Sequence, residues 1–285
     1  MAQKITDMIN LGGHISTSGG IELSPDRAIG FSFRSFQLFS KNQMQWKAKP
    51  LGKEEIELFK KSRRKNNISH VMIHASYLLN SATSDQELKG KVMEGLKLEI
   101  ERADLLEADS VTYHPGSRKD ASLEQGIRNV ISILNVVLKE EQNVKVLIEN
   151  SAGQGNSVGK TFQELSMIID GIELKDKIGI CFDTCHAWAA GYELVSREGY
   201  AETMDDLKSN LGMKYLIGFH MNDSKKGKGF NVDRHEQIGM GTIGLEGFRN
   251  FVYDEEIRGK PMILETPKGE EGYMEDITRL NSILR

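Results

Sequence analysis

Histidine is scarce in this chain, and most of it stands where a short apolar run of residues ends. Of the seven histidines, only His70 begins such a run, and the other six follow one directly or lie in the next loop. Those six are His14, His74, His114, His186, His220 and His235. Four carboxylates occupy similar places, namely Glu149, Asp183, Asp233 and Glu265. Imidazole combined with carboxylate and without thiolate is typical of sites for zinc, manganese or iron, so the pattern predicts a divalent metal centre with zinc as the first choice.

The number of donors indicates more than one metal ion. With His14 set aside, five imidazoles and four carboxylates are available. A catalytic zinc ion takes three protein ligands and keeps one position open, so nine donors are too many for one ion. Two or three ions that share a bridging carboxylate would use them all. Three divalent ions would outweigh four carboxylate charges and attract an anion, and a phosphodiester is a substrate that clustered metal ions are suited to hydrolyse.

The remaining candidates have plainer interpretations. His14 lies near the expected pocket, and either contact with substrate or ligands or simple packing accounts for it. His70 is expected to be structural. Cys181 and Cys185 form no CxxC motif, so we expect both to pack in the core.

The donors are positioned by eight apolar runs, which we interpret as strands. They span residues 9–14, 35–39, 69–74, 110–114, 144–149, 178–183, 215–220 and 261–265. Their continuous hydrophobicity indicates a sheet buried on both faces. Alternation with helical segments predicts parallel βαβ units that close into a (β/α)8 TIM barrel, an α/β fold whose strands all end at one face. An open doubly wound sheet is the alternative, but it would more often carry a glycine-rich phosphate loop, which this sequence lacks.

The segments between the runs carry helical patterns. A stripe at helical spacing consists of Ile127, Val130, Ile131, Leu134, Val137 and Leu138. Two pairs are candidate capping boxes that would open helices, Thr161 with Glu164 and Ser84 with Glu87.

Length and composition fit one globular domain, predicted to span residues 1–285. The formal net charge of −4 argues mildly against a protein that coats nucleic acid, but a local basic rim could still meet DNA. No apolar run approaches the roughly 20 residues of a membrane span, and the N-terminus lacks a secretory signal pattern. We therefore expect a cytoplasmic protein, associated with the nucleoid if the source is prokaryotic, and no membrane partner.

Nine motifs in order along the chain resemble the endonuclease IV family of apurinic/apyrimidinic (AP) endonucleases. They are GGHISTSGG at 12–20, KNQMQW at 41–46, HASYLLN at 74–80, HPGS at 114–117, ENSAGQG at 149–155, DTCHAWAAGY at 183–192, HMNDS at 220–224, DRH at 233–235 and LET at 264–266. Because they cover nearly the whole chain, the resemblance is specific.

The resemblance implies three zinc ions per chain, with Mn²⁺ as an alternative at one site. His74 and His114 would hold one ion, and Glu149 would bridge it to a second and orient the attacking hydroxide. Asp183, His220 and Glu265 would complete the second site, and His186, Asp233 and His235 would hold the third. The implied reaction, in base excision DNA repair, is hydrolysis of the phosphodiester 5′ to an abasic site. It leaves a 3′-hydroxyl and a 5′-deoxyribose phosphate, and removal of 3′-blocking groups would follow from the same geometry.

The implied partner is double-stranded DNA with abasic sites or 3′-blocked ends, and a monomer with a complete pocket would suffice. The family flips the abasic nucleotide and fills the gap with loop side chains, which match Tyr77 and Leu78 here. The loop residues Lys41, Asn42, Gln43 and Met44 are further candidate DNA contacts. Met44 departs from the family, which often has arginine there, as do Arg118 and Met240, where histidine and glutamate are usual. Lys225, Lys226 and Lys228 are either phosphate contacts or a solvated loop.

Two other functions compete with the nuclease. A sugar isomerase or epimerase of the xylose-isomerase type would use only Glu149, Asp183, His220 and Glu265, and would leave five donors without a role. A metal-stabilised protein that binds DNA lesions without cutting them is the non-enzymatic alternative. Because every predicted ligand is present, nothing in the sequence would explain a loss of activity.

Overall fold

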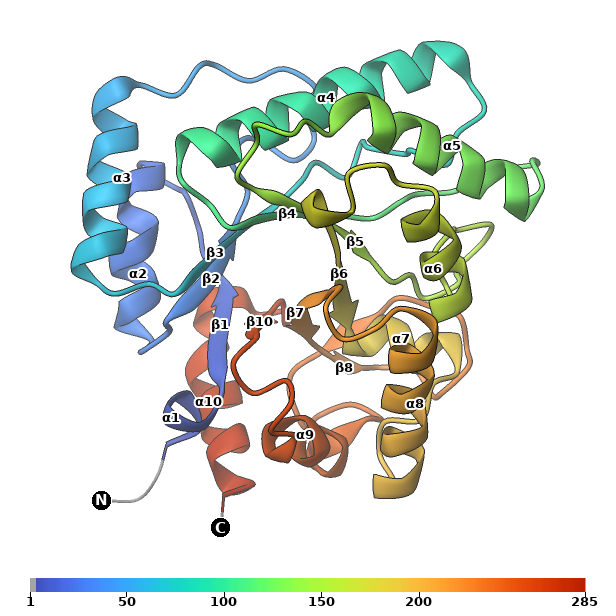
Figure 1. The fold of residues 1–285 in the computed structure, drawn as a ribbon. Coiled ribbons are helices and arrows are strands. Elements are labelled where there is room, and N and C mark those ends of the chain that lie inside the picture. Colours follow the sequence, from blue (N-terminus) through green and yellow to red (C-terminus); the bar gives the residue numbers. More distant parts are fainter. Residues whose placement is uncertain (1–3, 285) are drawn as a thin grey trace.

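The computed structural model describes residues 4–284, in which eight parallel strands close into a barrel (Figure 1). Residues 1–3 and 285, the ends of the predicted domain, lie outside the described part. The strands are β1 (Asn10–His14), β2 (Ser35–Leu38), β3 (His70–His74), β4 (Ser110–Tyr113), β5 (Lys145–Glu149), β6 (Ile178–Asp183), β7 (Leu216–Met221) and β10 (Pro261–Leu264). Each lies within one residue of its predicted bounds, so the predicted TIM barrel is confirmed.

The barrel closes where the first strand meets the last. The strand order is β1-β10-β7-β6-β5-β4-β3-β2, and β1 pairs with both β10 and β2. All of these pairs are parallel, so the strands end together at one mouth of the barrel.

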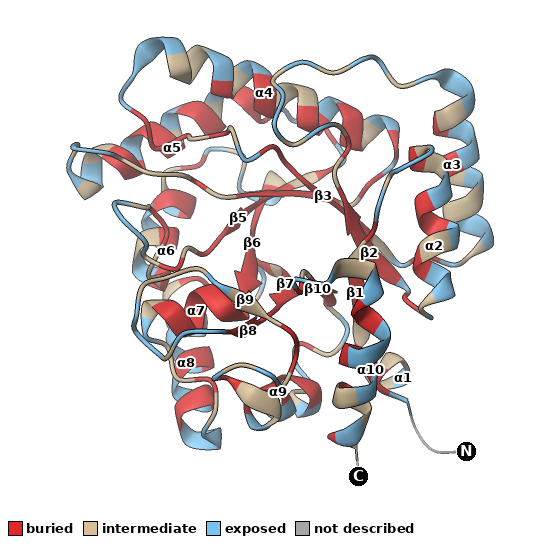
Figure 2. Ribbon diagram, turned by 180° about the vertical axis from the view of Figure 1, so that it is seen from behind, coloured by how far each residue is buried: buried red, intermediate tan, exposed pale blue. Residues whose placement is uncertain are grey.

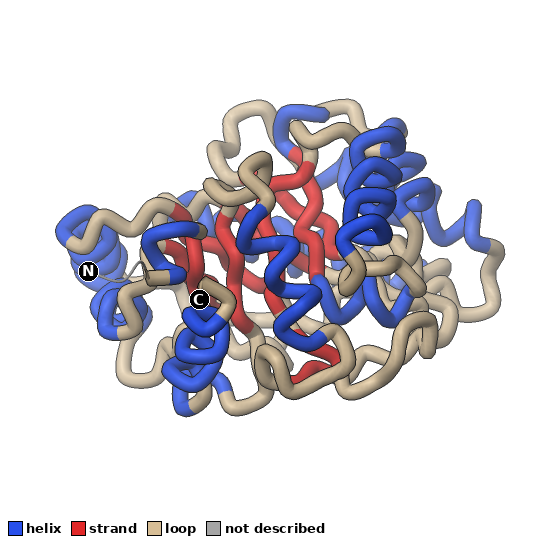
Figure 3. Tube along the Cα trace, turned by 90° about the horizontal axis from the view of Figure 1, so that it is seen from below, coloured by secondary structure: helices blue, strands red, loops and turns tan. Residues whose placement is uncertain are grey.

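Helices surround the strands on the outside, and Figure 3 shows the strands as a central group within them. The helices are α1 (Ile5–Met8), α2 (Ser24–Gly30), α3 (Lys53–Lys65), α4 (Gln86–Leu105), α5 (Leu123–Val137), α6 (Phe162–Asp170), α7 (Thr184–Ala190), α8 (Arg197–Asn210), α9 (Gly244–Tyr253) and α10 (Tyr273–Ser282). Three short 3₁₀ turns, η1 (Ile21–Leu23), η2 (Lys175–Lys177) and η3 (Gly269–Glu271), complete the described elements. None of the helices within residues 4–284 combines the length and apolar character that crossing a membrane requires.

The strands carry two buried layers because successive side chains point to opposite faces. One layer packs between strands and helices and forms the large core that Figure 2 shows as buried strands with exposed outer helix faces. The other fills the barrel interior, where Met72, Leu147 and Cys181 form a separate apolar cluster against Ile217. Two residues beyond each of these three, the same inward face reaches the barrel mouth.

The helix predictions succeeded in outline and failed at one cap. In α5 the predicted stripe is buried except for Ile131, which is half-buried, and Leu138 lies just beyond the helix end. Thr161 caps α6, with its hydroxyl accepting from the Glu164 amide. Helix α4, however, is capped by Asp85, whose carboxylate accepts from the Leu88 amide, and not by Ser84. The carboxylate is the stronger acceptor of two adjacent cap-forming residues, so the helix begins one residue later than expected.

One small element was not predicted. Strands β8 (Asp223–Ser224) and β9 (His235–Glu236) pair in antiparallel fashion after β7. Their pairing returns the chain to the barrel mouth after the loop 225–234. This brings a second pair of donors back to the face where β7 ends.

Candidate metal centre

The mouth of the barrel gathers all nine predicted donors. Eight stand at strand ends or in the adjoining loops, and His186 lies in the first turn of α7, directly after β6. The nine are His74, His114, Glu149, Asp183, His186, His220, Asp233, His235 and Glu265. Side chains that are far apart in the sequence therefore share one pocket, because parallel strands bring their carboxyl ends together.

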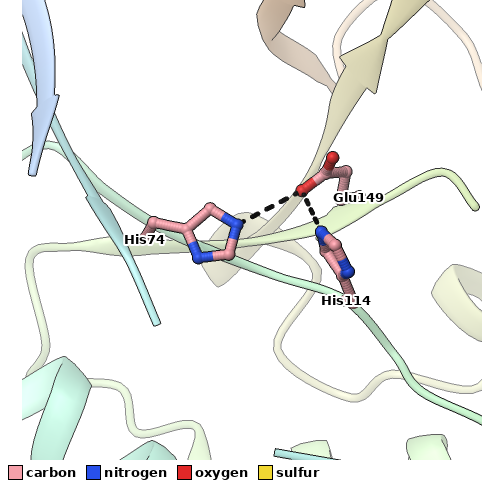
Figure 4. Close-up of side chains that lie close together, drawn as sticks. All are labelled: His74, His114 and Glu149. Carbon is pink, nitrogen blue, oxygen red and sulfur yellow. Dashed lines mark ion pairs between the residues drawn. The ribbon is translucent and has the colours of Figure 1, made fainter. Parts of the chain in front are cut away.

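The first ligand group consists of His74, His114 and Glu149 (Figure 4). The Glu149 Oε2 atom lies 3.1 Å from Nε2 of His114 and 3.7 Å from Nε2 of His74. The Nδ1–H of His74 donates to the carbonyl oxygen of Ala75 at 2.8 Å, which leaves Nε2 with a lone pair turned into the group.

The second ligand group consists of Glu149, Asp183, His220 and Glu265. Nδ1 of His220 lies 3.1 Å from Oε1 of Glu149 and 3.2 Å from Oε2 of Glu265. The Asp183 Oδ2 atom is 4.0 Å from the same nitrogen. Glu149 thus directs one carboxylate oxygen to each of the first two groups, which is the geometry of a bridging ligand.

The third ligand set lies beside the second and includes one more carboxylate than predicted. Oδ2 of Asp233 is 3.2 Å from Nε2 of His186, and Oδ1 is 3.3 Å from Nε2 of His235. Asp183 also joins this set, with Oδ2 3.6 Å from Nε2 of His235. The Cys185 thiol lies near Asp233 and His235 as well, and burial raises its pKa to about 12, which disfavours the thiolate in the absence of a cation.

The donor atoms fit bound cations because many of them have no other partner. Five buried atoms of these donors have no hydrogen-bond partner within the described residues: both carboxylate oxygens of Glu149, Nε2 of His186, Nδ1 of His220 and Nε2 of His235. An unsatisfied buried polar atom costs roughly 1–3 kcal/mol. Bound cations would satisfy five such atoms converging on one pocket, and the chemistry of these atoms suits zinc.

The donors shift one another's pKa values toward the charged forms. Burial lowers the pKa of His114, but the Glu149 carboxylate outweighs it and raises the pKa overall. Burial also opposes protonation of His186, yet Asp183 and Asp233 raise its pKa well above the ordinary value. Against its own burial, Glu149 has a pKa well below the usual range because of the imidazoles around it, and His186 lowers the pKa of Asp233 to about 2. Glu149 and Asp233 are therefore charged at neutral pH, and a cation would displace imidazole protons.

Two asparagines that the sequence interpretation missed orient the ligands. Asn150 holds the backbone of Asp183, accepting from its amide at 2.6 Å and donating to its carbonyl at 3.1 Å. Asn222 donates to Oδ2 of Asp183 at 2.7 Å and accepts from the Glu265 amide at 3.0 Å. Each follows a ligand closely in sequence, after Glu149 and after His220, and that adjacency was the available signal.

His14 lies near the ligand groups and His70 does not, as the sequence suggested. His14 lies beside the second ligand group, with Nδ1 3.0 Å from Nε2 of Gln37 and its ring 4.4 Å from the ring of Phe39. His70 is remote from the mouth and bonds the Ser110 hydroxyl at 2.9 Å.

Most of the candidate DNA contacts lie on two neighbouring loops. Tyr77 is 55% exposed and its ring lies 5.3 Å from that of His74, so it stands at the rim of the metal centre, with Leu78 half-buried beside it. Met44 is 62% exposed on the neighbouring loop, where Asn42 is exposed and Gln43 half-buried.

Lys41 differs from the expectation of a phosphate contact. Its side chain is 3% exposed, and Nζ lies 3.1 Å from Oε1 of the buried Glu99 on α4. It also donates to the carbonyl of Gln45 at 2.7 Å. The ammonium group is therefore committed within the protein, and the expectation for Lys41 is corrected.

The lysines of the loop 225–234 also differ from one another. All three are exposed, but Nζ of Lys228 pairs with the Glu193 carboxylate at 2.5 Å. The same loop carries Phe230, which is 66% exposed. An exposed aromatic next to exposed cations was not singled out from the sequence.

Comparisons of sequence and of structure both find similarity to endonuclease IV proteins. A family described as "Xylose isomerase-like TIM barrel" matches residues 26–283. The chain is similar to "Probable endonuclease 4" of Thermoplasma volcanium, at 44% identity over 96% of this chain and 95% of the relative, and to that of Campylobacter concisus, at 42% identity over 90% and 92%. Among solved structures, endonuclease IV from Thermus thermophilus superposes with a TM-score of 0.86 at 31% identity, covering 96% of this chain and 98% of that one. A D-tagatose 3-epimerase-like protein gives 0.74 at 22% identity over 97% of each chain, which shows a shared fold alone.

Proposed function

This chain belongs to the endonuclease IV family and is a nuclease, and from that premise we propose that it is a zinc-dependent AP endonuclease of base excision DNA repair. It hydrolyses the phosphodiester 5′ to an abasic site in double-stranded DNA and leaves a 3′-hydroxyl and a 5′-deoxyribose phosphate. We extend the proposal to the removal of 3′-blocking groups, because both reactions would cut the bond between phosphorus and the 3′-oxygen. The protein is proposed to act as a monomer in the cytoplasm.

The observation that carries the proposal is the convergence of nine donors whose buried atoms have few other partners among the described residues. We assign one zinc ion to His74, His114 and Glu149, and a second to Glu149 with Asp183, His220 and Glu265. The third is assigned to His186, Asp233 and His235, and Mn²⁺ is an alternative at one of the three. Zinc bound there would lower the pKa of water and offset the charge of a phosphate.

The protein's own side chains would position the reacting groups. Glu149 faces two ligand groups and would hold the attacking oxygen in line with the phosphorus. Partial burial of its phenol and the nearby Glu265 raise the pKa of Tyr77 to about 12, so the phenol stays neutral and would serve as a stacking surface at the rim, not as a base. With Leu78 it would fill the space left by an extruded nucleotide. No side chain is required as a covalent nucleophile.

A sugar isomerase would need only the second ligand group, which is complete by itself. It would leave His74, His114, His186, Asp233 and His235 clustered without a role. The likeness to epimerases lies in the fold, which does not determine the reaction.

The decisive experiment uses a labelled duplex with one abasic-site analogue and an undamaged duplex as control. We expect one cut on the 5′ side of the lesion that leaves a 3′-hydroxyl, loss of cutting after strong chelation, and recovery with zinc at three ions per chain. Cleavage on the 3′ side through a Schiff base would identify a lyase and contradict the proposal. Sugar epimerisation at one ion per chain, without cutting, would favour the isomerase.

A further inference from the structure

One buried glutamine connects three residues at the mouth of the barrel. Gln37 lies on the inward face of β2 with no exposed surface. Its side-chain nitrogen donates to Oε1 of Glu265 and to Nδ1 of His14, the latter at 3.0 Å. Its carbonyl oxygen Oε1 accepts from Nε2–H of His220 at 2.8 Å. Two of these partners belong to the second ligand group.

The chemistry of the partners fixes the direction of the amide. An ionised carboxylate only accepts hydrogen bonds, so the NH₂ end of Gln37 must face Glu265. The carbonyl end then faces His220, and the nitrogen of His220 that meets it must carry the hydrogen. A flipped amide would set two acceptors, Oε1 of Gln37 and Oε1 of Glu265, against each other. The arrangement has one low-energy orientation.

This orientation determines which nitrogen of His220 can bind a cation. With Nε2 holding a hydrogen, the lone pair lies on Nδ1, which has no hydrogen-bond partner among the described residues. Nδ1 is the atom that lies between Glu149 and Glu265, at 3.1 Å and 3.2 Å. In a metal-binding histidine, the hydrogen bond made by the ring nitrogen that does not bind the metal sets the tautomer and the ring orientation.

His220 differs in this respect from three other ligand histidines. His74, His186 and His235 direct their second ring nitrogen to main-chain carbonyls, those of Ala75, Asn150 and Glu265. A main-chain carbonyl is present whatever the side chain. The tautomer of His220 instead depends on one side chain, so a single substitution can remove the control.

We propose that Gln37 is a positioning residue that holds His220 in the Nε2–H tautomer and orients Glu265, and so sets how tightly the second ligand group retains its cation. The inference rests on the proposed zinc centre. It makes Gln37 part of the metal site although it does not itself ligate the ion.

The test compares two variants that lose a buried amide in the same way. Gln37→Met keeps the length of the side chain and removes its donors and acceptor. Gln142→Met is the matched control, because Gln142 is also buried and bonds the Lys139 amide and the Val144 carbonyl before β5, at the other end of the strand from Glu149. Both proteins are loaded with zinc, titrated with a graded chelator, and checked for folding by circular dichroism.

We expect Gln37→Met to lose one zinc ion at a roughly 10- to 100-fold lower chelator strength than the unaltered protein. Gln142→Met should retain zinc like the unaltered protein. Equal retention by both variants overturns the inference. If Gln37→Met does not fold, nitrogen-15 spectra of the zinc-loaded unaltered protein decide: a protonated Nε2 on His220 supports the inference, and zinc on Nε2 overturns it.

The result is independent of the cutting assay. Normal zinc retention in a Gln37→Met protein, with cutting of abasic DNA by the unaltered protein, would reject the role of Gln37 and keep the proposed function. Weakened retention in the variant, with no cutting by the unaltered protein, would do the reverse.

Discussion

At the scale of single residues, Glu149 lies between two sets of ligands. Its Oε2 atom faces the imidazoles of His114 and His74, and its Oε1 atom lies 3.1 Å from Nδ1 of His220 and 3.2 Å from Nδ1 of His186. Its side chain is 1% exposed. A buried carboxylate is stable in such a place only when cations or donors surround it. Its loss should therefore affect more than one metal ion.

We predict that Glu149→Gln loses two zinc ions per chain and that Asp233→Asn loses one. The amide has one acceptor and no charge, so it cannot bridge two cations, whereas Asp233 belongs to the third set. Loss of several kcal/mol of charge stabilisation corresponds to a fall in cutting rate of roughly 10³-fold or more. Zinc is counted by atomic emission and cutting by gel assay. Equal zinc loss in the two variants would contradict a bridging role.

At the scale of elements, α4 holds together the two loops that carry the candidate DNA contacts. Its residue Glu99 accepts from the Ser40 hydroxyl at 2.8 Å and from the Ser76 amide at 3.1 Å, in addition to pairing with Lys41. Ser40 begins the loop with Met44, and Ser76 lies next to Tyr77. The relative position of the loops thus depends on one buried charge.

We predict that Glu99→Gln lowers the free energy of unfolding by about 3–5 kcal/mol, because it leaves the Lys41 ammonium buried without a counter-charge. The control is Glu87→Gln on the same helix, whose pair with Lys91 at 2.6 Å is exposed and should cost less than about 1 kcal/mol. Urea unfolding measures both. The double variant Lys41→Met with Glu99→Gln should recover much of the loss, and no recovery would show that the pair is not the cause.

The same elements show what sequence patterns could and could not predict. Strand positions and the donors that end them followed from local hydrophobicity and from the rule that parallel strands end together. Lys41 was misjudged because its burial depends on Glu99, which belongs to a different element. The start of α4 was misplaced because Ser84 and Asp85 are both residue types that can cap a helix, and only Asp85 does so. Gln37 gave only a weak signal, a single amide within an apolar strand, since its partners lie on β1, on β7 and directly after β10.

At the scale of the whole molecule, the two ends of the barrel have different tasks. The mouth gathers the ligands, whereas the inward face at the other end of β3 begins with His70, two residues before the interior apolar cluster at Met72. Burial lowers the pKa of His70 to about 4. The neutral form is therefore favoured in the folded protein.

This shift predicts a specific loss of stability in acid. The unfolded chain binds a proton at His70 below about pH 6.5 and the folded chain only below about 4, so stability falls as the pH drops through that window. We expect the unaltered protein to lose about 1–3 kcal/mol more than His70→Gln between these pH values. Glutamine can keep the bond to Ser110 without titrating. Urea unfolding of both proteins across the window tests this, and parallel curves would contradict it.

The pairing of residues 10–13 of β1 with residues 261–264 of β10 has a consequence for synthesis of the protein. A polypeptide interrupted before residue 261 would have neither the strand that seals the barrel nor Glu265 after it. Unfinished translation products therefore cannot assemble the second ligand group, however much of the chain has emerged from the ribosome. The order of synthesis makes the capacity to cut DNA one of the last properties that the nascent chain acquires.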